Sequence, residues 1–194
     1  MKTEWFISDL HLGHEKTCTV FKKEDGSPLR PWNNAEEMNE ALIEKYNSLV
    51  KPTDVVYNLG DVVINKKFLH LVNRLNGHKV LVLGNHDFHK NVDMHDYFDE
   101  VHAILVKTGM VLTHVPVHPD SLSRFGINVH GHLHDKKVMM TAKNGSKVID
   151  PRYFNVGVEC IDFAPISREE LVVKIKEQGG ELSNKHGNYA SHTD

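Results

Sequence analysis

The sequence predicts a mixed α/β fold, because short apolar runs alternate with segments of helical periodicity in its first half and dominate its second half. The chain has 194 residues, of which 40% are hydrophobic and 25% charged, as in an ordinary soluble domain with a core. It contains no internal repeat and no linker-like segment. We therefore expect one domain over residues 1–178, followed by a polar, flexible tail over residues 179–194.

The first elements alternate between strand and helix. A strand is expected at about residues 4–8, followed by an irregular segment, 12–34, that contains several glycines and prolines. The next element is a helix over about residues 35–50, for which Asn34 is a suitable N-cap. The residues expected on its core-facing side are Met38, Leu42, Tyr46 and Leu49.

Two further strands flank a second helix. The run "DVVYNLGD" at 54–61 indicates a strand, and the apolar spacing over 66–76 indicates a helix with Gly77 as its C-cap. The near-continuous apolar run at 79–87 is typical of a strand that is covered on both faces.

The second half of the chain contributes mostly strands, and a helix ends it. The shorter strands are expected near residues 101–106, 110–113, 127–130, 136–141 and 153–158. Ser167 and Glu170 form the pattern of a capping box for a helix that ends at about residue 177. Ile166 and Leu171 are placed as its hydrophobic staple.

Composition argues against several classes of function. A net charge of −3 without a basic tract argues against stable nucleic-acid binding, and no apolar run is long enough to span a membrane. Cys18 and Cys160 are far apart in the sequence and are expected to be reduced thiols, so we expect a cytoplasmic protein. The unusual feature is the 15 histidines, which suggest either metal binding and proton chemistry or a set of exposed loop residues.

Polar side chains that can bind metals follow five of the expected strands. They are Asp9 and His11, then Asp61, then Asn85, His86 and Asp87, then His114, and finally His132 and His134. Each motif alone is weak, because Gly-Asp after a strand is most often a turn. In an open α/β sheet, however, ligands bind outside the carboxyl ends of the strands. These distant segments are therefore expected to converge on one site.

The order of these motifs resembles that of the calcineurin-like metallophosphoesterase superfamily, which has Asp-x-His, Gly-Asp, Gly-Asn-His-Asp, a lone His and Gly-His-x-His. The resemblance covers about residues 4–165, and the run over residues 33–61 is similar to the small stand-alone bacterial and phage members. It implies a four-layer αββα sandwich, in which two facing mixed β-sheets are flanked by helices, and a metal-dependent phosphoesterase activity.

The resemblance also implies two divalent metal ions. One would be held by Asp9, His11 and His134, and the other by Asn85, His114 and His132, with the Asp61 carboxylate bridging both. Nitrogen and oxygen ligands without a thiolate suit Mn²⁺, which we expect first, and also Fe, Zn²⁺, Co²⁺ or Ni²⁺. Two such ions would generate a bridging hydroxide that attacks the phosphorus atom.

Residues beyond the metal ligands have less certain roles. By the same resemblance His86 is the general acid that protonates the leaving alkoxide and Asp87 supports it, although a structural role for His86 stays open. His14 and Arg124 are the candidate substrate contacts, while a packing role for His14 and a solvated loop position for Arg124 stay open. Trp32, in the 12–34 segment, either stacks a nucleobase or anchors its loop.

The expected substrate is a small, nucleotide-like phosphodiester or phosphomonoester. The run "GDVVINKK" departs from the Gly-Asp-x-x-Asp-Arg pattern of the superfamily's protein phosphatases, and the chain has no room for the capping domain of its double-strand-break nucleases. A nuclease acting on short nucleic acid stays an alternative, and so does a non-catalytic metal-binding scaffold on the same fold. A scaffold would be expected to lose the acid at the His86 position.

Overall fold

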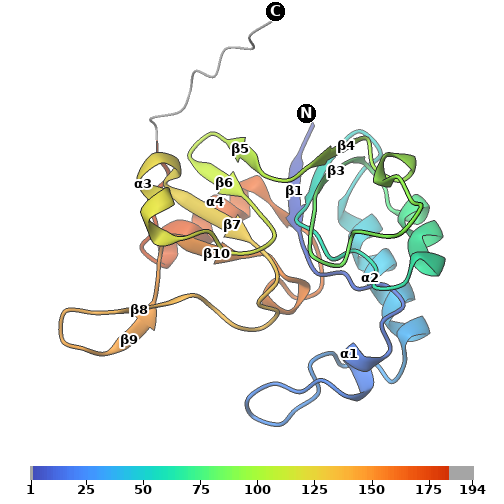
Figure 1. Ribbon diagram of the computed structural model, residues 1–194, viewed down its shortest axis with the longest axis horizontal. Helices are drawn as coiled ribbons and strands as arrows, with labels where there is room; N and C mark the ends of the chain where they lie inside the picture. Colours follow the sequence, from blue (N-terminus) through green and yellow to red (C-terminus); the bar gives the residue numbers. More distant parts are fainter. Residues whose placement is uncertain (1, 184–194) are drawn as a thin grey trace, which may run out of the picture.

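The structure, a computed structural model, describes residues 2–183, and its strands form two mixed sheets and a separate hairpin (Figure 1). The first sheet has the order β11-β1-β2-β3-β4. Its strands are β1 (Glu4–Ile7), β2 (Val55–Asn58), β3 (His78–Val82), β4 (Glu100–His102) and β11 (Ile166–Ser167). The strands β1 to β4 run parallel, and β11 pairs antiparallel with β1 at the edge. The carboxyl ends of β1, β2 and β3 therefore meet at one edge of the sheet.

The second sheet has the order β10-β7-β6-β5. Its strands are β5 (Leu105–Lys107), β6 (Met110–Leu112), β7 (Ile127–His130) and β10 (Tyr153–Asn155). The strands β6, β7 and β10 are parallel, and β5 pairs antiparallel with β6. The remaining strands, β8 (Met139–Thr141) and β9 (Lys147–Ile149), pair only with each other in a hairpin that projects from the body (Figure 1).

Helices cover the sheets and fill their edges. The longer ones are α2 (Ala35–Leu49), α4 (Arg168–Glu177) and the 3₁₀-helix η1 (Lys66–Arg74). The shorter ones are α1 (Lys16–Thr19), α3 (Leu122–Phe125), η2 (Met94–Asp96), η3 (Pro119–Ser121) and η4 (Val158–Cys160). None of the helices within residues 2–183 is long and apolar enough to cross a membrane.

The two sheets face each other across a shared core. Phe6 and Val80 of the first sheet lie in one buried cluster with Leu112 and Val129 of the second. The alternate residues of the first sheet, such as Ile7, point to the other side and pack against α2 and η1. A third, smaller cluster joins the outer face of the second sheet to α3. The mixed α/β class and the layered sandwich of two sheets with flanking helices are confirmed.

Several local predictions are confirmed by specific hydrogen bonds. The side chain of Asn34 accepts a hydrogen bond from the backbone N–H of Glu37 (2.8 Å), as an N-cap does. Ser167 and Glu170 form a complete capping box at the start of α4. The expected strand at 79–87 is β3, and Val80 and Val82 in it are fully buried, as the apolar run predicts.

Other local predictions are wrong. Leu49 is 41% exposed, so the buried face of α2 ends at Tyr46. The second helix lies where it was expected, but it is a 3₁₀-helix, which aligns the buried Leu69 and Val72 on one face. Its C-cap is Leu75, whereas Gly77 (φ +92°) begins the turn into β3.

The end of the chain divides into two parts. Most of the tail expected over residues 179–194, from residue 184 onward, lies outside the described residues. Leu182, inside the expected tail, packs against the core between the two sheets. Three elements were not predicted from the sequence: β9, β11 and the single helical turn α1 in the 12–34 segment.

Candidate metal centre

The loops after five parallel strands converge where the two sheets meet. Two groups of side chains lie there, and within each group the potential ligand atoms are all within 4.8 Å of one another. One group is Asp9, His11 and His134, and the other is Asp61, His114 and His132. Asn85 joins the second group, since its Oδ1 lies 3.1 Å from His114 Nε2. The structure therefore brings together all seven predicted metal ligands.

The two groups adjoin each other. Nε2 of His11 lies 3.7 Å from Asp9 Oδ1 and 3.7 Å from Asp61 Oδ2, so it faces a carboxylate of each group. The backbone N–H of His132 donates to Asp9 Oδ2 (2.9 Å), which ties the loop after β7 in the second sheet to the loop after β1 in the first. Asp61 thus lies between the groups, where a bridging ligand is expected.

The donor set fits divalent cations. Asp9 Oδ1 and both ring nitrogens of His11 are buried and have no hydrogen-bond partner among the described residues. Buried polar atoms are normally satisfied, and a cation would satisfy these. The Leu59 carbonyl accepts the Nδ1 proton of His114 (2.7 Å), which leaves Nε2 of the neutral ring with a lone pair directed at Asp61 and Asn85.

The electrostatics of the site favour positive charge. Burial alone would raise the pKa of Asp9, but the adjacent imidazole of His11 and the more distant ones of His114 and His134 lower it to about 2, so the carboxylate is ionised near neutral pH. Burial would lower the pKa of His114, but the Asp61 hydrogen bond and the charges of Asp9 and Asp61 raise it.

The backbone of the candidate ligands is strained. Five of them are non-glycine residues with left-handed φ: Asp9 (58°), His11 (48°), Asp61 (55°), His132 (68°) and His134 (52°). Each such conformation costs about 1–3 kcal/mol and is typically found at functional sites. The glycines beside them allow close approach, because a Cβ on Gly131 would overlap Ser8 and Asp9, and one on Gly84 would overlap Asp61.

His86 lies at the open side of the centre. Its side chain is 48% exposed, and its Nε2 lies 4.0 Å from Asp61 Oδ2. Its backbone N–H donates to Asp61 Oδ1 (2.9 Å), which places the imidazole beside the expected bridging carboxylate. This position is compatible with the predicted general acid, whose role stays a prediction.

Asp87 has a different position from the one expected. Its buried carboxylate accepts hydrogen bonds from the backbone N–H groups of Asp61 (2.8 Å), Val62 (3.0 Å) and Gly84 (2.8 Å). Burial raises its pKa despite these bonds. Within the described chain none of its hydrogen bonds reaches His86, so Asp87 holds the loops after β2 and β3 together instead of orienting that imidazole.

The predicted substrate contacts differ in where they lie. The His14 ring lies 5.7 Å from the His11 ring, centroid to centroid, and burial lowers its pKa to about 4, so it is neutral at pH 7. Arg124 is in α3, before the amino end of β7, whereas His132 and His134 follow the carboxyl end. Arg124 is therefore not brought to the centre, and its expected role there is not supported.

Trp32 anchors its loop. Its ring packs edge-on against Phe163 at 4.9 Å between centroids and against the core beneath α2. Of the two roles that the sequence left open for Trp32, the structure favours the anchor over the stacking platform.

Two residues that were not predicted from the sequence, Arg30 and Glu159, support the centre. The fully buried guanidinium of Arg30 donates to the carbonyls of Asp9 (2.6 Å) and Leu10 (2.7 Å) and to Glu159 Oε1 (2.8 Å). The same Glu159 oxygen lies 3.3 Å from Nδ1 of His134. Burial would lower the pKa of His134, but Glu159 raises it. The pair thus fixes both the backbone of Asp9 and the ring of His134.

One missed residue carried a signal in the sequence. Glu159 is a lone carboxylate in the apolar run "NVGVECI" after β10, the same pattern that revealed the metal ligands. Arg30 carried none, because its acceptors come from segments distant in the chain.

Comparisons with known proteins agree with the fold. No family model matches the chain. A solved structure, the protein of unknown function AQ665 from Aquifex aeolicus, superposes with a TM-score of 0.63 at 25% identity, covering 90% of this chain and 100% of that one. The Gene 66 protein of Mycobacterium phage L5 is 26% identical over 224 residues, covering 93% of this chain and 99% of the phage protein. The uncharacterized protein MJ1445 of Methanocaldococcus jannaschii is 33% identical over 189 residues, which cover 92% of this chain and 94% of that protein. The chain belongs to the family of this archaeal protein.

Proposed function

We propose that the protein is a metallophosphoesterase of the calcineurin-like type, which uses two divalent metal ions to hydrolyse a small, nucleotide-like phosphodiester or phosphomonoester. The observation that carries the proposal is the meeting of two ligand groups around Asp61, with His86 4.0 Å from that carboxylate. Asp9, His11 and His134 would hold one ion, and Asn85, His114 and His132 the other, with Asp61 shared. Mn²⁺ is our first choice of metal.

Two ions in this position would supply Lewis acidity toward a phosphate ester and activate water for attack. Hydrolysis forms a bond between a water oxygen and phosphorus and breaks the bond between phosphorus and the leaving oxygen. His86 supplies a proton to that leaving oxygen, because its imidazole is exposed beside Asp61 and belongs to neither ligand group. Arg30 and Glu159 keep the Asp9 loop and the His134 ring in place.

The test is hydrolysis by metal-depleted protein reloaded with Mn²⁺. We expect turnover of bis-p-nitrophenyl phosphate or p-nitrophenyl phosphate, and we expect Asp61→Ala to lose both metal and activity. Asp120→Ala is the control, since the Asp120 side chain is 93% exposed. Absence of turnover on both esters with Mn²⁺, Ni²⁺ and Co²⁺ would refute the proposal, and metal binding without turnover would favour the non-catalytic scaffold.

The role of His86 has a separate test. A general acid matters most when the leaving group is poor, so His86→Ala should slow release of an alkoxide by about 10²–10⁴-fold and release of p-nitrophenolate much less. An equal effect on both leaving groups would show that His86 acts on binding or structure.

A further inference from the structure

An open pocket of about 500 Å³ adjoins the candidate metal centre. Its lining includes His132 and His134, one from each ligand group. Its apolar lining residues are Val20, Phe21, Leu29 and Leu133. Its charged lining residues are Lys22, Asp135 and Lys136. A volume of this size lies within the usual range for small-molecule sites and exceeds what a phosphate group needs.

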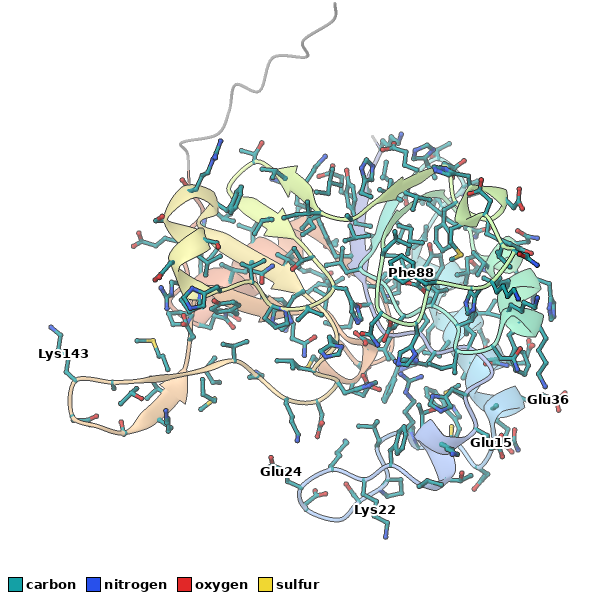
Figure 2. All side chains as sticks on the ribbon, in the orientation of Figure 1. Glu15, Lys22, Glu24, Glu36, Phe88 and Lys143 are labelled. Atoms are coloured by element: carbon teal, nitrogen blue, oxygen red, sulfur yellow. The ribbon has the colours of Figure 1, made fainter. Side chains whose placement is uncertain are left out.

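One wall of the pocket is the loop that follows α1, where Lys22 and Glu24 are labelled in Figure 2. Hydrogen bonds from Leu29 N–H to the Phe21 carbonyl (2.9 Å) and from Lys23 N–H to the Ser27 carbonyl (2.9 Å) close this loop on itself. Leu29 and Arg30 at its base are buried. The loop therefore holds Phe21 in a defined position next to the centre.

The opposite wall is fixed to the second sheet. The side-chain amide of Asn155 donates to the carbonyls of His134 (2.9 Å) and Lys136 (3.0 Å). The thiol of Cys160 also donates to the His134 carbonyl (3.1 Å). Both walls are thus held by hydrogen bonds, and the pocket is preformed.

Apolar side chains face solvent in this pocket. Val20 is 57% exposed and Phe21 is 40% exposed. The Phe21 ring meets the His14 ring edge-on at 5.6 Å between centroids, and the His14 ring lies 5.7 Å from that of His11. A continuous row of rings therefore leads from His11 of the candidate metal centre to Phe21.

We propose that this pocket binds the nucleoside part of a nucleotide substrate, with the base against Phe21. The inference rests on the proposed function and narrows its substrate class. A bare phosphate or a methyl ester would leave Phe21 and Val20 in water, whereas a base stacked on an aromatic side chain gains affinity. Lys22 and Lys136 outnumber Asp135 and suit the hydroxyl and phosphate oxygens of a nucleotide.

The experiment compares two substrates with the same leaving group: the p-nitrophenyl ester of thymidine 5′-monophosphate and methyl p-nitrophenyl phosphate. Both release p-nitrophenolate when water adds to phosphorus. We expect kcat/KM to be at least about tenfold higher for the nucleotide ester, with Phe21→Ala removing about tenfold for that ester and leaving the methyl ester within about twofold. Calorimetry of the Mn²⁺-loaded protein should show about tenfold weaker binding of thymidine 5′-monophosphate to Phe21→Ala, with unchanged binding of inorganic phosphate.

Phe88→Ala is the matched control, because Phe88 is 74% exposed, follows His86 by two residues and lines a different pocket. Equal kcat/KM for both esters, or a loss of thymidine 5′-monophosphate affinity in Phe88→Ala instead of Phe21→Ala, would overturn the inference while the phosphoesterase function stands. Failure to hydrolyse either ester would instead count against the proposed function.

Discussion

Replacing Glu159 by glutamine tests the buried ion pair beneath the metal centre. The side chains of Arg30 and Glu159 are both fully buried, so Glu159→Gln leaves the guanidinium without a compensating negative charge. Removing one partner of a buried pair typically destabilises a protein by 3–5 kcal/mol. Glutamine retains an oxygen that can accept from Arg30, so we expect the lower end of that range, about 3 kcal/mol.

The same change acts on the metal site. Glu159 Oε1 lies 3.3 Å from Nδ1 of His134 and, by accepting its proton, would leave Nε2 free to bind a metal ion. Loss of such a supporting carboxylate typically weakens metal affinity by about 10–100-fold. We therefore expect weaker binding at the group of Asp9, His11 and His134, and smaller effects at the group of Asp61, His114 and His132.

Two measurements separate these effects. Thermal unfolding in EDTA should show Tm lowered by about 6–12 °C, at roughly 2–4 °C per kcal/mol for a chain of this size. Calorimetric titration with Mn²⁺ should show one weakened site. Glu40→Gln is the control, because it removes a carboxylate from an exposed pair with Arg74 and should change both quantities little. A lowered Tm with unchanged metal affinity would refute the supporting role, and an unchanged Tm would refute the energetic argument.

Three further predictions concern other parts of the fold. Gly131→Ala should destabilise the protein by about 1–3 kcal/mol and reduce its metal content, since the added Cβ overlaps Ser8 and Asp9, as thermal unfolding and metal analysis can check. Burial would raise the pKa of Glu4, but Lys107 and Tyr57 lower it. The ionised Glu4 side chain therefore stabilises the fold by about 1 kcal/mol above about pH 4.5, and this contribution is lost as the pH falls through the lowered pKa. The difference in Tm between wild type and Glu4→Gln should accordingly shrink between pH 7 and pH 3, and a constant difference would contradict this. Burial raises the pKa of Cys160 to about 11, so iodoacetamide at pH 8 should label its thiol quickly only after unfolding, as mass spectrometry can follow.

The convergence of the candidate metal ligands was predictable because it depends on general rules. Parallel strands end at the same edge of a sheet, so Asp9, Asp61 and Asn85 had to lie near one another once β1, β2 and β3 were recognised. The cap at Asn34 was equally predictable, since a capping residue acts within three positions of itself.

Features that depend on distant partners were not predictable. From the sequence, Arg30 is expected to be an exposed loop cation. Its hydrogen-bond acceptors explain why it is fully buried, and one of them, Glu159, lies 129 positions further along the chain. The sequence predicts that Asp87 supports His86, because the two residues are neighbours. In the structure three backbone N–H groups donate to the Asp87 carboxylate instead. Arg124 was misplaced because sequence proximity to a ligand-bearing strand does not tell which end of that strand a residue lies near.

The left-handed backbone at five candidate ligands has a consequence for how this fold tolerates mutation. Glycine adopts positive φ at no steric cost, so exchanging the partly exposed His132 for glycine relieves strain even as it removes a candidate ligand. Without metal, such a variant should therefore resist unfolding better than the natural protein. A search that selects for thermal stability alone would drift toward an inert protein, whereas selection for activity preserves the strained residues.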